Sequence, residues 1–172
     1  MKLTTRQLTL CGVLTTLALA LSVAENQIPL TMAIPIPGIK LGLANIVTVF
    51  ALYALGPAQA ILILLARCTL GALFAGNMNA LLFSLMGGLA AMGMMILLSR
   101  LRALSVYGVS IGGAAAHNCG QIAAAVLTLG NTAPLYYLPI LLGVSLFTGA
   151  FTGLVAACLF RALDRTGFLR RG

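Results

Sequence analysis

PGIKLGLANIVTVFA, residues 37–51, begins with a proline–glycine turn and then carries Lys40 and Asn45 into a long apolar run. Lys40 is one of very few charged residues that lie away from the chain ends and from the connection at residues 99–104. Polar residues at the start of so apolar a run predict a membrane helix with a functional group near one end. We therefore expect the rest of the chain to form a bundle that holds these and a few other polar groups together.

The composition predicts an all-α integral membrane protein. Of the 172 residues, 61% are hydrophobic and only 7% are charged, whereas a soluble domain has about a quarter charged residues. Glu25 and Asp164 are the two acidic residues of the whole sequence. The apolar runs are long and rich in Leu, Ala, Gly and Met, which favours helices over the short alternating segments of a barrel.

We expect a single transmembrane domain over residues 1–172, folded as a bundle of six helices. Its spans are predicted at residues 7–24, 41–55, 58–73, 80–98, 105–129 and 135–163. The second and third spans are shorter than the roughly 20 residues that cross a bilayer alone, so they could instead form a tight hairpin. A first apolar run beside basic residues also suits a signal peptide, but no A-x-A site stands out before Glu25, and we interpret it as a retained span.

A proline-rich outer loop is expected at residues 25–40. Three prolines within residues 28–37 oppose a helix, yet the segment carries no charge. We expect it to lie at the membrane interface or to fold over the outer mouth of the bundle as a lid.

The basic residues predict the orientation. With six spans, eight of the ten lysines and arginines fall on one side, and the positive-inside rule assigns that side to the cytoplasm. Both termini are then cytoplasmic, and Lys40 and Arg67 are left over. Because these basic residues are scattered beside apolar spans rather than clustered on one face, the net charge of +8 does not indicate nucleic-acid binding.

A few polar residues within the apolar spans are the candidate substrate-binding residues, because ionisable groups in a membrane are costly and often functional. His117 and Gln121 are four residues apart and share a helix face, with Asn118 beside them. The two cations have no nearby acid except Glu25, which leaves room for an anionic ligand. The full set is Lys40, Asn45, Arg67, His117, Asn118 and Gln121.

Each candidate also has a purely structural interpretation. Arg67 could extend to the outer surface along its aliphatic stem, and Lys40 could sit at the interface. His117 alone is more often a packing residue than a ligand contact. These alternatives stay open at the level of the sequence.

Small residues recur at every fourth position in three spans, a pattern that lets helices approach closely in lipid. Packing within the bundle is one explanation. Docking to another membrane subunit is the other, and it is most plausible for the first span, with Gly12, Thr16, Ala20 and Ala24.

Enzyme chemistry has little support in the sequence. Magnesium-dependent prenyl or phosphoryl transfer needs clustered carboxylates, and there is no G-x-x-x-x-G-K-[ST] phosphate loop. The four cysteines fall in separate spans without a CxxC pair, which favours packing over a metal site or disulfides. We expect no catalytic residue, metal or cofactor.

The segments PGIKLGLANIVTVFAL, LLARCTLGALFAG and VSIGGAAAHNCGQIAAAVL, followed by YYLP, resemble the Gx transporter family, often labelled heptaprenyl diphosphate synthase component I. That family is similar to the substrate-binding S components of energy-coupling factor transporters. The resemblance implies a six-helix protein of the bacterial cytoplasmic membrane, with an outward-facing pocket under its first loop. It also implies a first helix that docks to a shared transmembrane coupling subunit.

The resemblance places the six candidate residues among the polar members of the matched motifs. We therefore expect an S-component-like protein that captures a small anionic or amphipathic molecule, with coupling and ATPase subunits as partners. The alternative is a non-catalytic accessory subunit of heptaprenyl diphosphate or quinone biosynthesis. A self-sufficient carrier or channel is a third possibility.

Overall fold

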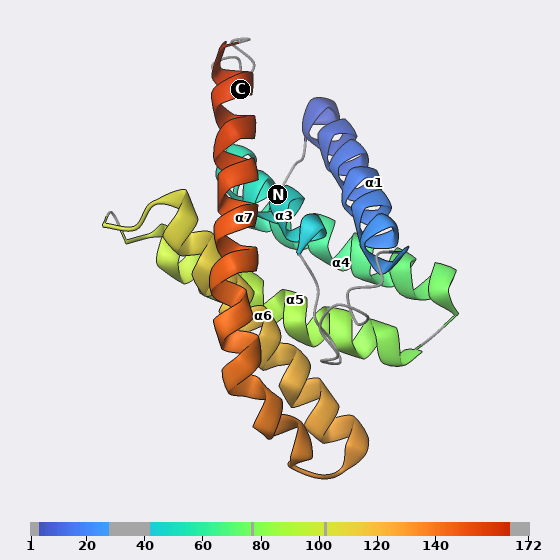
Figure 1. Cartoon of the computed structure of the whole chain (residues 1–172). Helices are drawn as coiled ribbons and strands as arrows, with labels where there is room; N and C mark the ends of the chain where they lie inside the picture. The colour runs from blue at the N-terminus through green and yellow to red at the C-terminus, as the bar shows by residue number, and fades with distance from the viewer. Residues whose placement is uncertain (1–3, 28–41, 77, 102, 166–172) are drawn as a thin grey trace.

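The computed structural model describes residues 4–27, 42–76, 78–101 and 103–165, and within these ranges the chain is helical apart from short connections. The prediction of an all-helical chain is confirmed. Figure 1 shows the helices, which are α1 (Thr5–Gln27), α3 (Leu43–Ala54), α4 (Pro57–Ala75), α5 (Met78–Ser99), α6 (Val106–Leu129), the 3₁₀ turn η1 (Ala133–Tyr137) and α7 (Leu138–Arg165).

Four of these helical segments are long and apolar enough to cross a membrane: Thr5–Glu25, Pro57–Ala75, Met78–Ser99 and Ala133–Leu163. Helix α3 is apolar but has only 12 residues. Helix α6 has 24 residues, but His117, Asn118 and Gln121 in its middle make it less apolar than the four. A bundle of six membrane-crossing helices and its orientation therefore stay predictions.

Helix α1 continues into the region predicted as an outer loop, since it ends at Gln27 rather than before Glu25. The rest of that predicted loop, including the proline-rich segment and Lys40, lies outside the described residues. The turn between α3 and α4 agrees with its sequence. Gly56 takes a positive φ of 98° and Pro57 opens α4, the position where a fixed φ and a missing N–H cost nothing.

Helix α5 packs between α4 and α6. Helices α6 and α7 lie side by side and antiparallel (Figure 1). Their contact depends on glycine. A Cβ atom at Gly149 would lie 2.5 Å from the Cα of Ile111, and one at Gly153 would lie 2.9 Å from the Cα of Tyr107. Gly120 likewise faces the backbone carbonyl of Met86 on α5. Small residues of the fifth and sixth predicted spans therefore pack within the protein.

The apolar core lies between α3, α4, α5 and α6. Its most deeply buried large side chains are Val49, Ile63, Leu64, Met92, Met95 and Val109. On α4 the buried residues Ala60, Leu64 and Cys68 are four residues apart, as expected for a helix that buries one stripe. Beside this core lies a cavity.

Candidate ligand-binding site

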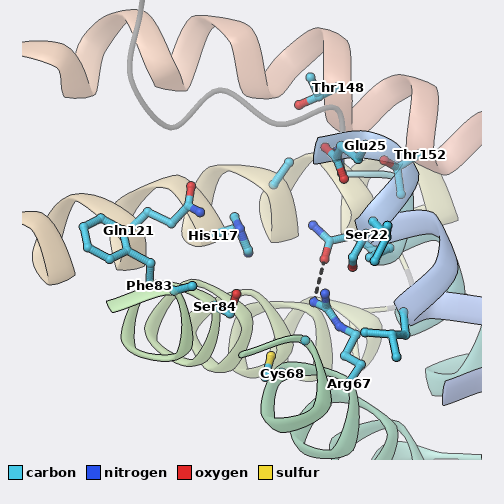
Figure 2. A pocket seen from close by; sticks show the side chains of 18 of the residues that line it. Ser22, Glu25, Arg67, Cys68, Phe83, Ser84, His117, Gln121, Thr148 and Thr152 are labelled. Atoms are coloured by element: carbon cyan, nitrogen blue, oxygen red, sulfur yellow. Dashed lines mark hydrogen bonds between the residues drawn. The ribbon is translucent and has the colours of Figure 1, made fainter. Parts of the chain in front are cut away.

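A cavity of about 520 Å³ lies among the helices, and each of the six α-helices in the described part of the chain contributes to its wall (Figure 2). Its volume is within the range of about 300 to 1,000 Å³ that is usual for small-molecule sites. Much of the lining is apolar. Its polar members are Ser22, Glu25, Gln27, Asn45, Arg67, Ser84, Ser110, His117, Asn118, Gln121, Thr148 and Thr152.

One face of α6 forms a continuous wall of the cavity. The lining residues of this helix run from Ser110 to Gln121 at intervals of three, one, three, one and three residues, which is the spacing of a single helix face. At 1.5 Å per residue this wall is about 16 Å long. His117 and Gln121 share this face with Ser110, as the sequence predicted for the first two.

Arg67 of α4 is buried, with 9% of its surface exposed. Its Nη2 donates to the Oδ1 of Asn45 on α3, at 3.4 Å (Figure 2). Its Nε is buried and has no hydrogen-bond partner in the described part of the chain. Arg67 therefore lines the cavity rather than extending to the outer surface, and it has donor capacity left.

Glu25, near the end of α1, is also buried. One carboxylate oxygen accepts a hydrogen bond from the backbone N–H of Gly42, at 2.7 Å. Gly42 is the N-cap of α3 and has a φ of 78°, so the negative charge lies at the positive end of the α3 dipole. The contact explains why α1 continues past the predicted span, because Glu25 joins α1 to the start of α3.

His117 and Gln121 lie against α5 at a glycine. A Cβ atom at Gly87 would lie 2.9 Å from the Cγ of Gln121 and 3.0 Å from the Cε1 of His117. Only a residue without a side chain leaves room for both at these positions. Figure 2 shows Gln121 well separated from Arg67, with His117 between them.

Asn118 joins α6 to α7. Its Nδ2 donates to the carbonyl oxygen of Leu141 at 2.9 Å and to the Oγ of Ser145 at 3.3 Å. The Ser145 Oγ also donates to the Leu141 carbonyl oxygen, at 2.8 Å. Asn118 contributes to the cavity wall, but both of these bonds use its amide nitrogen for packing.

We expect the Asn118→Ala variant to be less stable by about 1–2 kcal/mol, the scale measured for hydrogen bonds between membrane helices. The loss leaves the Leu141 carbonyl with one donor fewer. A double-mutant cycle with Ser145→Ala, read by thermal unfolding in detergent, measures the coupling between the two side chains. Strict additivity would contradict the assignment of Asn118 as an interhelical tie.

The structure thus brings Asn45, Arg67, His117, Asn118 and Gln121 together around one cavity, and Lys40 lies outside the described residues. Sequence reasoning did not select the hydroxyl residues of the wall. Ser110 could have been selected from the sequence, because it lies seven residues before His117 and therefore on the same helix face. Thr148 and Thr152 of α7 are four residues apart and share a face in the same way.

The four small residues predicted to dock a partner helix form an exposed stripe on α1: Gly12, Thr16, Ala20 and Ala24. A Cβ atom at Gly12 would meet nothing within 4 Å. This differs from the glycines of α6 and α7, which face neighbouring backbone. No group of three or more metal-ligating side chains is found among the residues that the structure describes.

Comparison with known proteins identifies a family. Residues 14–159 match the family described as heptaprenyl diphosphate synthase component I. This range contains every residue that lines the cavity. Neither the curated proteins nor the solved structures contain a match to the chain.

Proposed function

Since the chain belongs to the family described as heptaprenyl diphosphate synthase component I, we propose that it is a non-catalytic membrane subunit that binds a small anionic or amphipathic molecule. The observation that carries the proposal is the buried Arg67 in the wall of a cavity of ligand size. A buried guanidinium with an unused donor is costly unless an acceptor is supplied. A bound anion would supply it.

The proposed contacts are Asn45, Arg67, His117 and Gln121 in the wall, with Asn118 supporting them from α6. Lys40, which lies outside the described residues, is proposed as a further contact for the same anionic group. A lysine two residues before Gly42 is close in sequence to the end of the cavity where Glu25 and Asn45 lie.

Capture of the molecule for transport is the first candidate role. In this role the chain works as an S component, takes its ligand from outside and passes it inward with a coupling subunit and ATPases. The cavity and the exposed stripe of small residues on α1 support this role. Exposed small residues allow close approach of a second helix.

An accessory role in prenyl diphosphate synthesis is the second candidate, and the family description supports it more directly than transport. The chain would then act beside a soluble catalytic subunit. Catalysis by this chain itself is disfavoured, because Glu25 and Asp164 are the whole acidic inventory and binding of magnesium diphosphate needs clustered carboxylates. Glu25 is also engaged with Gly42.

Purification from the membranes of the native host, followed by identification of stably associated subunits, tests the two roles. Paired ATPases and a coupling subunit support transport. A stoichiometric complex with a soluble prenyl diphosphate synthase supports the accessory role and would exclude the first. Uptake into liposomes that contain this chain alone would contradict both and indicate a self-sufficient carrier.

The stripe on α1 gives a separate prediction. We expect the double variant Gly12→Leu, Ala20→Leu to reduce recovery of the membrane partner at least about tenfold, since loss of close helix contact costs on the order of 1.4 kcal/mol or more. Gly143→Leu on α7 is the matched control, because Gly143 is also exposed and has nothing within 4 Å of its Cβ position. If the wild type, the double variant and Gly143→Leu recovered the same amount of the membrane partner, the exposed small residues of α1 would contact lipid rather than a partner helix.

A further inference from the structure

The cavity has two chemically different ends. Arg67 and Glu25 lie at one end, together with the hydrogen bond from Arg67 to Asn45, and Gln121 lies at the other (Figure 2). Apolar lining residues such as Val49, Ala72 and Met95 complete the wall. A ligand that fills the cavity would meet a different partner at each end.

The Arg67 end suits an anionic group. The Glu25 carboxylate interacts electrostatically with Arg67, but its hydrogen bond goes to the N–H of Gly42 at the start of α3 and not to the guanidinium. The Arg67 side chain uses Nη2 for Asn45, while the buried Nε lacks a partner among the described residues. A guanidinium with free donors binds carboxylate or phosphate oxygens in pairs, and such charge-assisted bonds are roughly twice as strong as neutral ones.

The Gln121 end suits a neutral hydrogen-bonding group. Gln121 is 7% exposed, and with His117 it fits against α5 only because residue 87 is glycine. A carboxamide both donates and accepts hydrogen bonds, so it matches an amide or a carbonyl group.

The volume of the cavity favours a small ligand. It is about 520 Å³, within the range of about 300 to 1,000 Å³ that is usual for small-molecule sites. We therefore expect a molecule of that size rather than a whole heptaprenyl diphosphate.

We propose that the ligand is a small two-ended molecule, with an anionic group held by Arg67 and a neutral hydrogen-bonding group held by Gln121 and His117. Its apolar middle crosses the cavity between them. This inference rests on the proposed function, in which the cavity is the ligand site. It adds the chemical class and the expected size of the ligand.

Disulfide tethering at Cys68 tests this inference in the full-length protein in lipid nanodiscs. Cys68 is buried and lines the cavity, whereas Cys158 is exposed and outside it, so Cys158 is an internal control. The symmetrical disulfide of each thiol named below is equilibrated with the protein and a reductant, so that a cysteine thiolate attacks the disulfide, forms the mixed disulfide and releases one thiol. Peptide mass spectrometry then gives the fraction of each cysteine modified.

The first pair of thiols examines the anionic end. Relative to Cys158, we expect 3-sulfanylpropanoate to modify Cys68 about tenfold more than 3-sulfanylpropanamide, as a charge-assisted bond predicts. Arg67→Gln should remove that preference. If the two thiols modified Cys68 of the wild type equally, the proposal that Arg67 holds an anionic group would be wrong.

The second pair examines the far end. We expect 8-sulfanyloctanamide to modify Cys68 several-fold more than 1-nonanethiol, which has the same length but ends in a methyl group. Gln121→Leu should remove this difference. Gly87→Ala, which displaces Gln121 and His117 without deleting either, is the second variant if the first does not fold. If the two thiols modified Cys68 of the wild type equally, the proposal that Gln121 and His117 hold a neutral hydrogen-bonding group would be wrong.

A competition with 3-sulfanylpropanoate examines the expected size of the ligand. The two competitors are heptaprenyl diphosphate and isopentenyl diphosphate at equal concentration. If heptaprenyl diphosphate protected Cys68 more strongly, the expected small size of the ligand would be wrong. Equal or weaker protection by heptaprenyl diphosphate supports the small size. Failure of the proposed function gives a different result from failure of this inference. If no thiol modifies Cys68 while Cys158 reacts, the cavity admits no molecule; modification without preference overturns only the two-ended ligand.

Discussion

Replacing Arg67 with Ala is expected to lower ligand occupancy of the purified protein at least about 30-fold, because truncating one partner of a buried charge pair costs about 2–5 kcal/mol. Arg67 is buried, and its Nε has no partner among the residues described. The variant therefore loses the donor that the ligand would use, together with the hydrogen bond from Nη2 to Asn45. Native mass spectrometry of protein purified with its endogenous ligand measures the occupied fraction directly.

Two control variants make this result specific. Arg67→Lys keeps the charge but loses the paired donors of the guanidinium, so it should retain only part of the binding. Arg161→Ala removes an exposed arginine of α7 that does not line the cavity, and it should behave as the wild type. Unchanged occupancy in Arg67→Ala would remove Arg67 from the site.

The stability of Arg67→Ala separates loss of binding from loss of fold. Removing a buried charge that lacks part of its hydrogen bonding should not destabilise the ligand-free protein, since such groups are costly to bury. We expect the thermal unfolding midpoint without ligand to be unchanged or higher. A large fall would mean that Arg67 supports the fold through Asn45 rather than the ligand.

Replacing Gly149 with Ala is expected to destabilise the protein by about 1–3 kcal/mol, the usual cost of forcing extra volume into a packed interface. The added methyl would lie 2.5 Å from the Cα of Ile111 on α6. Backbone atoms cannot move aside as a side-chain end can, so α6 and α7 would have to separate. Thermal unfolding in a single detergent measures the effect.

Gly143 is the matched control on the same helix. Its Cβ position has nothing within 4 Å, and alanine is favoured over glycine in a helix by about 1 kcal/mol. Gly143→Ala should therefore leave the unfolding midpoint unchanged or raise it. The same midpoint for both variants would contradict the close α6–α7 contact.

Much of this fold could be predicted from the sequence, because its signals are local. Long apolar runs broken by Gly56-Pro57 or by Gly130 define helices and their ends without knowledge of the partners. The gathering of Arg67, His117 and Gln121 also followed from a general rule, since polar residues in apolar helices face the interior of a bundle. Periodicity alone placed His117 and Gln121 on one face.

The remaining features depend on tertiary register. Nothing in the sequence shows that Glu25 accepts the N–H of Gly42, or that Asn118 reaches Leu141 on another helix. The sequence also does not show that Gly87 contacts His117 and Gln121, because nothing distinguishes it from other glycines of an apolar helix. The prediction of six crossing helices rested on counting apolar runs. The sequence already indicated that the second span is short, and α3 has 12 residues.

The cavity has a consequence for the life of the protein in the cell. Every α-helix that the structure describes borders this space, so a ligand-free molecule lacks the packing contacts that a bound ligand would make. A ligand bound there would fill this space and stabilise the folded state. The stabilisation would grow with the logarithm of the ligand concentration. The supply of the ligand would then set how much of the protein persists against proteolysis, so that abundance itself reports on availability.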